Sequence, residues 1–351
     1  MRGLCVLSFL ALAACTAAEV RPPEPIETSK PAADLWQFSD HVDRLRAESC
    51  PDGAAYERAD SLDLRVAEVT RGSAIARDNN LSGLRLAGAW HLHSPNKDFG
   101  GLSGLDVMRS GSLLSITDDG KFVWIGIDPD SGAPDGIGSI AEMRDADGDA
   151  YRVKTHADSE DLVFRDGLAL VSFEQNHRID AYDLESCGAA ARAASVVELD
   201  QMVDGRLLDG NRGAEAMAMF GEGLSVGFET QHEGGSPIGD VNTNGTLENI
   251  RRTRQPIFYL ITGMDHSDGL TAQVFRAYDP VRGARGIVRV SREGAQIAEA
   301  NLKKPLPVDN YEGIAIGTSP AGTPRIWLVS DDNFNDSQKT LLLAFDLDPA
   351  N

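Results

Sequence analysis

The chain has 351 residues, and its 54 Asp and Glu outnumber its 33 Lys and Arg, which gives a formal net charge of −21 at pH 7. This charge disfavours nucleic acids and anionic lipid surfaces as partners, because their phosphates would be repelled. The 35 glycines and the 6% content of aromatic residues suit short strands and many turns better than a helical bundle.

Residues 1–14 have the layout of a secretory signal peptide, because Arg2 precedes an apolar run that is too short to span a bilayer. The run ends in LAAC, which resembles a lipobox and predicts lipidation of Cys15; an ordinary signal peptide with a chance cysteine is the alternative. Residues 15–33 contain four prolines and are expected to form a stiff tether. Since Thr16 rather than Asp follows Cys15, we expect a lipid anchor in the outer membrane, facing the periplasm.

Residues 34–351 are expected to form one domain, which contains Cys50 and Cys187. An oxidising periplasm permits a single disulfide between them, with two buried thiols as the alternative. No spacing of cysteines or histidines fits a zinc or haem site.

A hairpin pattern occurs four times in this domain. Each copy begins with a small or acidic residue, here called the lead residue, and continues through an alternating apolar strand, a glycine-containing turn and a second strand that ends in an acid. The lead residues are Ser103, Glu160, Glu215 and Glu312, and the strand-end acids are Asp118, Glu174, Glu229 and Asp331. Lead residue and acid are 15, 14, 14 and 19 residues apart, which indicates one hairpin used repeatedly.

A third strand is expected in each unit, over residues 122–128, 178–184, 256–262 and 341–347. Residues 271–279 and 286–291 provide strands of a divergent fifth unit, and residues 60–98 contain enough strand-like sequence for a sixth. Units of about 50 residues predict an all-β fold, a β-propeller with five to six blades of three or four antiparallel strands. A β-sandwich is the alternative architecture.

The first strand of a propeller blade lies nearest the axis, so the acids of the hairpins are expected to converge on one mouth of the channel. Clustered carboxylates repel one another unless cations or protons neutralise them, and several hard oxygen ligands suit Ca²⁺. Their alternative role is to accept hydrogen bonds from turn amides and hold the blades together. The predicted metal ligands are Glu160, Glu174, Glu215, Glu229, Glu312, Asp118 and Asp331.

Seven motifs, in this order and spacing, resemble the phytase-like family described as "esterase-like activity of phytase". They are FGGLSGL (99–105), TDDG (117–120), SEDL (159–162), SFEQNHRI (172–179), NRGAEAM (211–217), DNYEGIA (309–315) and SDDNFNDSQKTLLLAF (330–345). The resemblance covers residues 84–347 and implies a propeller-like domain with characteristic acids that acts on phosphate or other esters. The divergent unit departs from it, because Arg276 stands where a further strand-end acid is expected; it either replaces a metal ligand or binds an anion.

Basic residues beside the acids are candidates for catalysis and phosphate binding. Arg178, Arg212 and His177 are predicted to hold the anion, with Lys121 as a further cation, and His177 is also a candidate general acid or base. A packing or surface role is the alternative for His177. The loop that begins at Asp240 resembles the opening of a calcium loop, but Arg251 occupies position twelve, where such a loop needs an acid.

The sequence therefore predicts a monomeric periplasmic lipoprotein that hydrolyses small phosphate esters with the help of Ca²⁺. A non-catalytic propeller that binds a ligand or a protein of the cell envelope is the alternative, because a fold does not determine a function. Serine hydrolase chemistry is disfavoured, since GLSGL at residues 101–105 is out of register with a nucleophile elbow.

Overall fold

The computed structural model describes residues 34–69, 81–203, 205–208, 212–230, 235–279, 281, 283–335 and 337–348. The predicted signal peptide, Cys15 and the tether lie outside these residues. Within the described residues, none of the helices combines the length and the apolar character that crossing a membrane requires.

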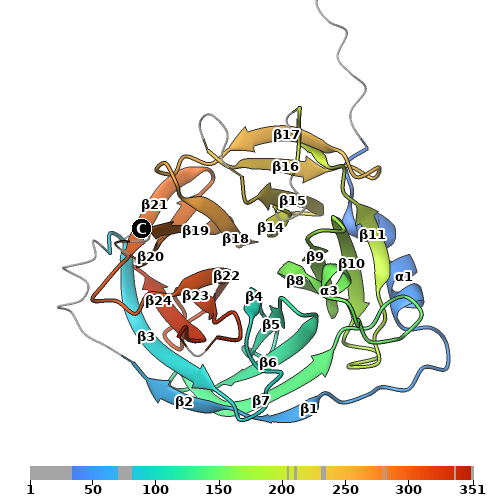
Figure 1. The fold of residues 1–351 in the computed structure, drawn as a ribbon, viewed down its shortest axis with the longest axis horizontal. Coiled ribbons are helices and arrows are strands. Elements are labelled where there is room, and N and C mark those ends of the chain that lie inside the picture. Colours follow the sequence, from blue (N-terminus) through green and yellow to red (C-terminus); the bar gives the residue numbers. More distant parts are fainter. Residues whose placement is uncertain are drawn as a thin grey trace, which may run out of the picture. The chain divides into compact units, whose positions relative to one another are not determined.

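The described chain is a five-bladed β-propeller of antiparallel sheets (Figure 1). From the axis outward, blade 1 contains β4 (Leu102–Val107), β5 (Leu113–Thr117), β6 (Lys121–Ile127), β7 (Pro134–Glu142) and β1 (Asp60–Asp63). Blade 2 contains β8 (Ser159–Arg165), β9 (Leu168–Phe173), β10 (Arg178–Asp183) and β11 (Ala194–Glu198). Blade 3 contains β14 (Ala214–Phe220), β15 (Gly223–Phe228), β16 (Pro237–Val241) and β17 (Leu247–Arg252). A small hairpin of β12 (Met202–Val203) and β13 (Arg206–Leu207) links blades 2 and 3.

Blades 4 and 5 complete the ring. They contain β18 (Leu260–Ser267), β19 (Leu270–Asp279), β20 (Gly283–Arg292) and β21 (Ala295–Leu302), then β22 (Asn310–Thr318), β23 (Pro324–Asp331), β24 (Leu341–Leu347), β3 (Leu84–His93) and β2 (Arg65–Glu68). The innermost strands of successive blades contact one another around the ring, including β22 with β4. This closed arrangement excludes the β-sandwich.

Blade 5 combines strands from both ends of the described chain. The early strand β3 pairs with the late strand β24, and the two lie side by side in Figure 1. Residues 60–98 therefore do not form the sixth blade that their strand-like sequence suggested, because β1 extends blade 1 while β2 and β3 extend blade 5. As a result, blades 1 and 5 have five strands, whereas blades 2, 3 and 4 have four, within the expected range.

The hairpin pattern is confirmed in four blades, and the divergent unit supplies β19 and β20 of blade 4. The expectation that residues 256–262 form the third strand of blade 3 is wrong. Blade 3 uses β16 (residues 237–241) instead, and Leu260 begins the innermost strand of blade 4. Thr262 thereby becomes the lead residue of blade 4.

Each innermost strand has a β-bulge at or beside its lead residue, since the register with the second strand shifts there in all five blades. A bulge re-aims a side chain and bends the strand. The next residue is glycine in blades 1, 4 and 5, where neighbouring backbones approach closely. A Cβ on Gly313 would lie 2.5 Å from the carbonyl oxygen of Ser103 in blade 1.

Residues before β3 run around the outside of the ring. Trp36 donates a backbone hydrogen bond to Val241 of blade 3, and helix α1 (Phe38–Ser49) packs on the outer strands of blade 2. The chain then adds β1 to blade 1 and β2 to blade 5. Cys50, at the end of α1, is joined in a disulfide to Cys187, which follows β10, with 5.7 Å between their Cα atoms.

Candidate functional site

The shared register of the five hairpins brings equivalent positions together at one end of the innermost strands. The residue that ends the second strand lies opposite the residue two places before the lead residue, as in the pairs Asp118 with Gly101 and Glu174 with Asp158. Blade 5 repeats this pairing with Asp331 opposite Asn310. In blade 4 the same position holds Arg276, opposite Leu260.

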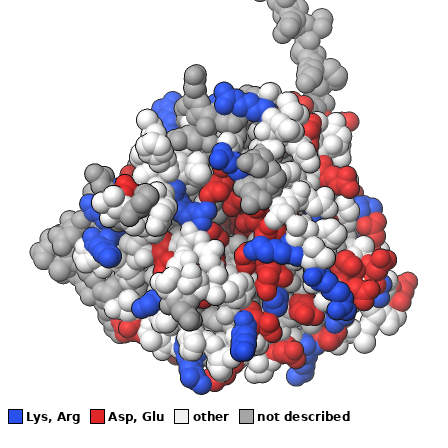
Figure 2. All heavy atoms as spheres, in the orientation of Figure 1, with Lys and Arg blue, Asp and Glu red and all other residues white. Residues whose placement is uncertain are grey.

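Eight carboxylates form what we call the acidic cluster: Asp118, Asp158, Glu160, Glu174, Glu215, Glu229, Glu312 and Asp331. Their charges act on one another around the ring, because Glu160 interacts with Glu174 and Glu312, while Glu215 interacts with Glu229. Figure 2 shows acidic atoms at the centre of the face viewed in Figure 1, with basic atoms among them. The seven acids singled out from the sequence are thus neighbours.

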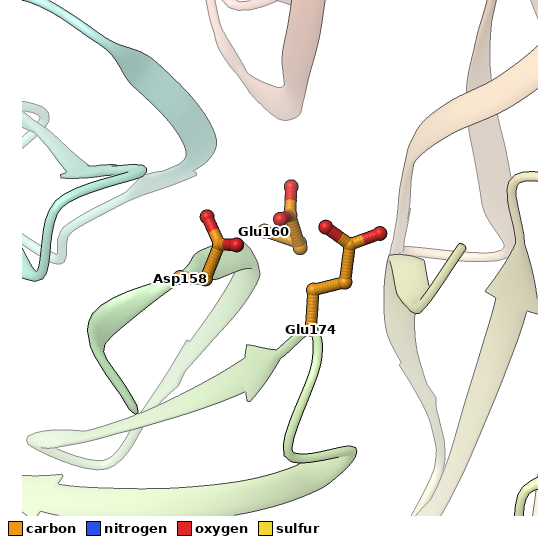
Figure 3. A group of neighbouring side chains, drawn as sticks. All are labelled: Asp158, Glu160 and Glu174. Carbon is orange, nitrogen blue, oxygen red and sulfur yellow. The ribbon is translucent and has the colours of Figure 1, made fainter. Parts of the chain in front are cut away.

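Three of these acids approach as metal ligands do. One oxygen from each of Asp158, Glu160 and Glu174 lies within 4.8 Å of the other two, and the three side chains point toward a common space in Figure 3. Asp158 did not figure among the acids singled out from the sequence. Its signal was the Asp-x-Glu spacing with Glu160, which places both residues beside the bulge of β8.

Burial and mutual repulsion raise the pKa values of six acids of the cluster, namely Asp118, Glu160, Glu174, Glu215, Glu312 and Asp331. Burial first, then the charges of Glu174, Glu312, Asp158 and Asp118, raise the pKa of Glu160 well above its usual value. Burial is also the main reason why the pKa of Glu174 rises to about 7. Such shifts show that negative charge is costly here unless a cation neutralises it.

Burial likewise dominates for the acids contributed by blade 5. It raises the pKa of Glu312 to about 8, despite the opposing charge of Arg276, and the pKa of Asp331 to about 6. Both acids are almost completely buried. Ionising the acids of blade 5 is therefore costly, as it is for Glu160 and Glu174 of blade 2.

The donor set fits a hard divalent cation. The cluster offers carboxylate oxygens, the ligands that Ca²⁺ prefers. Among the described residues, no group donates a hydrogen bond to the carboxylate of Glu160, and Oδ1 of Asp118 is buried without a hydrogen-bond partner. A bound cation would satisfy these oxygens.

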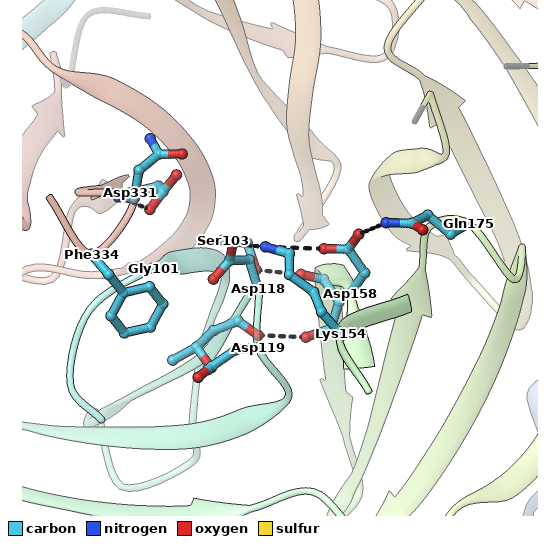
Figure 4. A network of polar contacts seen from close by, with 12 residues as sticks. Gly101, Ser103, Asp118, Asp119, Lys154, Asp158, Gln175, Asp331 and Phe334 are labelled. Carbon is cyan, nitrogen blue, oxygen red and sulfur yellow. Dashed lines mark hydrogen bonds and ion pairs between the residues drawn. The ribbon is translucent and has the colours of Figure 1, made fainter. Parts of the chain in front are cut away.

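Lys154, in the short helix α3 (Lys154–Ala157), places a positive charge beside Asp158 (Figure 4). Its Nζ donates a hydrogen bond to Asp118 and lies 3.6 Å from Oδ1 of Asp158. Burial disfavours its charge, but the hydrogen bond to Asp118 and the charges of Asp118, Asp158 and Glu160 outweigh burial and raise its pKa to about 12. Lys154 therefore remains charged at neutral pH.

Arg276 is the second cation of the cluster. Its Nη2 lies 2.6 Å from Oε1 of Glu229, and its Nη1 donates hydrogen bonds to Glu312 and Asn310. Asn310 in turn donates to Oε1 of Glu312, at 2.8 Å, and to Oδ2 of Asp331, at 3.1 Å. Arg276 of blade 4 thus forms ion pairs with acids of both neighbouring blades, 3 and 5.

Two of the three residues predicted to hold the anion are not brought to the acidic cluster. Arg178 forms an ion pair with Asp180 at 2.7 Å, and its guanidinium lies over the ring of Phe173, 3.8 Å from the centroid. His177 is buried, and burial lowers its pKa. Arg212 is exposed and precedes Gly213, whose amide donates a hydrogen bond to Glu174, so it stays beside the cluster.

The environment of Arg178 predicts a structural role. We expect Arg178→Lys to destabilise the fold by roughly 1–3 kcal/mol, because a lysine cannot reproduce the stacking on Phe173 together with the hydrogen bonds to Asp180 and Tyr151. Chemical denaturation and Ca²⁺ titration of the same preparation measure both properties. A tenfold loss of Ca²⁺ affinity at unchanged stability would contradict this role.

Lys121 and the predicted calcium loop at Asp240 form ion pairs with residues close to them in the fold. Lys121 forms an ion pair with Asp119. Asp240 lies in β16 and is paired with Arg251 at 2.9 Å, so the residue that spoils the calcium-loop pattern neutralises the first acid of that loop. Ser225 and Asn249 also donate hydrogen bonds to Asp240.

A second set of acids, of which Asp161 is buried and Asp106 and Asp265 are half-buried, connects the innermost strands of neighbouring blades. Asp106 accepts a hydrogen bond from the amide of Phe164 in blade 2, and Asp265 accepts one from Ile316 in blade 5. Asp161 accepts a hydrogen bond from Met217 in blade 3. Burial raises the pKa of all three, to about 6 for Asp265. These acids hold blades together, the role considered as an alternative for the acids of the hairpins.

The geometry agrees with the comparison of the sequence with protein families. The model of the phytase-like family, described as esterase-like activity of phytase, matches residues 97–245 and 267–334. The chain belongs to this family. The matched ranges include all eight acids of the cluster and Arg276, while no curated protein matches the sequence.

The solved structures that match the chain are distant in sequence. The PQQ-bound aldose sugar dehydrogenase of Streptomyces coelicolor is 12% identical, with a TM-score of 0.41, over 81% of this chain and 98% of that chain. The PQQ domain of pyranose dehydrogenase from Coprinopsis cinerea is 11% identical, with a TM-score of 0.38, over 84% and 99%. An α-L-arabinofuranosidase of Lactobacillus brevis is 11% identical, with a TM-score of 0.39, over 70% and 90%.

Proposed function

We propose that this phytase-like propeller hydrolyses phosphate esters with the help of a divalent cation, Ca²⁺ being the best match to its ligands. The observation that carries the proposal is the group of Asp158, Glu160 and Glu174, whose oxygens approach within 4.8 Å although burial makes the charges of Glu160 and Glu174 costly. A cation bound there would polarise a phosphoryl oxygen and acidify a water molecule. Membership of the phytase-like family supports the choice of a phosphate ester.

The residues of the chain provide the remaining functions of such a site. Lys154 and the exposed Arg212 place positive charge beside the acids, which would attract a phosphate that the net charge of −21 otherwise repels. Burial, followed by the charges of Glu160 and Glu229, raises the pKa of Glu215 well above its usual value. A carboxyl group that keeps its proton beside the metal ligands can donate that proton to a leaving oxygen.

The place of action is part of the proposal. The lipobox-like LAAC sequence at residues 12–15 supports a lipid anchor, and the disulfide between Cys50 and Cys187 supports an oxidising compartment such as the periplasm. The substrate would then be a small phosphate ester available in the periplasm, hydrolysed by a monomer held at the outer membrane.

Assays of the purified protein against phosphomonoesters and phosphodiesters, with Ca²⁺, with Mg²⁺ and with EDTA, test the proposal. We expect turnover that EDTA abolishes and Ca²⁺ restores. Binding of Ca²⁺ without turnover of either ester class would instead support a non-catalytic binding propeller. Absence of both binding and turnover would contradict the proposed function.

A further inference from the structure

Arg276 occupies a position that the other blades assign to an acid. The acid that ends the second strand or directly follows it is Asp118 in blade 1, Glu174 in blade 2, Glu229 in blade 3 and Asp331 in blade 5. Arg276 lies opposite Leu260, two residues before the lead residue Thr262, which is the same register. The substitution therefore reverses the charge of one position in an otherwise acidic set.

The guanidinium bridges the two neighbouring blades. It contacts Glu229 of blade 3 at 2.6 Å and also binds Glu312 and Asn310 of blade 5. The ion pairs are largely buried, since 24% of the Arg276 side chain is exposed, against 18% for Glu229 and 11% for Glu312. One cation thus neutralises two buried carboxylates and holds them together. A bound metal ion would do the same.

The acids of blade 2 have a different environment. No Lys or Arg among the described residues forms an ion pair with Glu160 or Glu174, and Asp158 is reached only by Lys154, at 3.6 Å. Arg276 thus neutralises the acids of blades 3 and 5. Within the described residues, the blade 2 acids of the cluster have no arginine of their own, so an external cation can bind there.

We propose that Arg276 takes the place of a second divalent cation, so that the acidic cluster binds a single divalent cation, at blade 2. The proposal rests on the proposed metal-binding role of Asp158, Glu160 and Glu174. A guanidinium is permanently charged and presents its donors in a fixed plane, so it holds Glu229 and Glu312 in place whether or not metal is present.

The stoichiometry of Ca²⁺ binding, measured by isothermal titration calorimetry and by atomic absorption after gel filtration, tests this inference. We expect one Ca²⁺ per chain for the unmodified protein and two for Arg276→Gln, whose acids at blades 3 and 5 lose their cation. Arg276→Lys retains the charge and should bind one. The double variant Arg276→Gln with Glu229→Gln removes the charge and one acid together, and should also return to one.

Thermal unfolding keeps the test informative if Arg276→Gln is unstable. In EDTA this variant should unfold at a lower temperature than the unmodified protein, and Ca²⁺ should raise its Tm by more than that of the unmodified protein. A variant that folds only in Ca²⁺ is purified with it and assayed for two bound ions by atomic absorption.

The outcomes separate this inference from the proposed function. One Ca²⁺ in both proteins, or two in both, overturns the role of Arg276 and leaves the metal centre of blade 2 standing. No Ca²⁺ in the unmodified protein but one in Arg276→Gln supports the role of Arg276 and contradicts the proposed centre at blade 2. No Ca²⁺ in either protein overturns both.

Discussion

Glu160→Gln is expected to weaken Ca²⁺ binding by about two orders of magnitude, and to raise the thermal stability of the metal-free protein. The carboxylate is half-buried and is repelled by Glu174 and Glu312, so an uncharged amide of the same shape removes a cost from the metal-free fold. The same amide is a poor ligand for a hard cation. Calorimetric Ca²⁺ titration and thermal unfolding in EDTA measure the two effects, and ester hydrolysis should fall at least as far as Ca²⁺ affinity.

Glu142→Gln is the matched control. Glu142 is an exposed acid of β7 in blade 1, so the same chemical change there should alter neither Ca²⁺ affinity nor stability beyond about 0.5 kcal/mol. The opposite signs of the two effects distinguish a metal ligand from a structural acid. If Glu160→Gln destabilised the metal-free protein and left Ca²⁺ affinity unchanged, Glu160 would be a structural residue.

Metal-free protein is expected to lose stability as the pH rises from about 4.5 to about 8. The pKa values of Glu174 and Glu312 in the fold are about 7 and about 8, above the ordinary value of 4.5 for an unfolded chain. In this range the folded protein retains protons that the unfolded chain has released, so each rise in pH favours unfolding. Together the two groups contribute on the order of a few kcal/mol, which corresponds to several degrees in Tm.

Ca²⁺ should remove most of this pH dependence, because it binds the ionised acids and competes with protons. A residual decline of the same sign is expected from Asp106, Asp161 and Asp265, which lie further along the innermost strands and whose pKa values burial also raises. Thermal unfolding at several pH values, in EDTA and in Ca²⁺, measures both slopes. A metal-free protein that gained stability between pH 5 and pH 8 would refute this account of the cluster.

The repeated hairpins were predictable because their signals are local. Alternating apolar residues, a glycine-containing turn and an acid at a nearly constant interval located eight strands, and placed Glu160, Glu215 and Glu312 at one end of the fold. Ring closure was not predictable in this way. The pairing of β3 with β24 joins residues about 250 positions apart, and no local pattern specifies which distant strand fills an outer position.

The errors at the site have a physical cause in strand geometry. Arg178 follows Glu174 closely in sequence, yet it pairs with Phe173 across the hairpin and its side chain turns to Asp180 and Tyr151. Proximity in the chain was mistaken for proximity in space. Asp158 was missed for the converse reason, since it lies two places before the lead residue, whereas the register of the hairpin sets it opposite Glu174.

The pairing of β3 with β24 also constrains the order of folding. Blades 1 to 4 consist mainly of strands that follow one another in the chain, so each can form its hairpins as soon as its own segment is available. Blade 5 cannot be completed until residues 341–347 reach β3, and contacts between such distant residues form slowly. Until then β3 presents an unpaired edge, to which a chaperone or a second unfinished chain can bind.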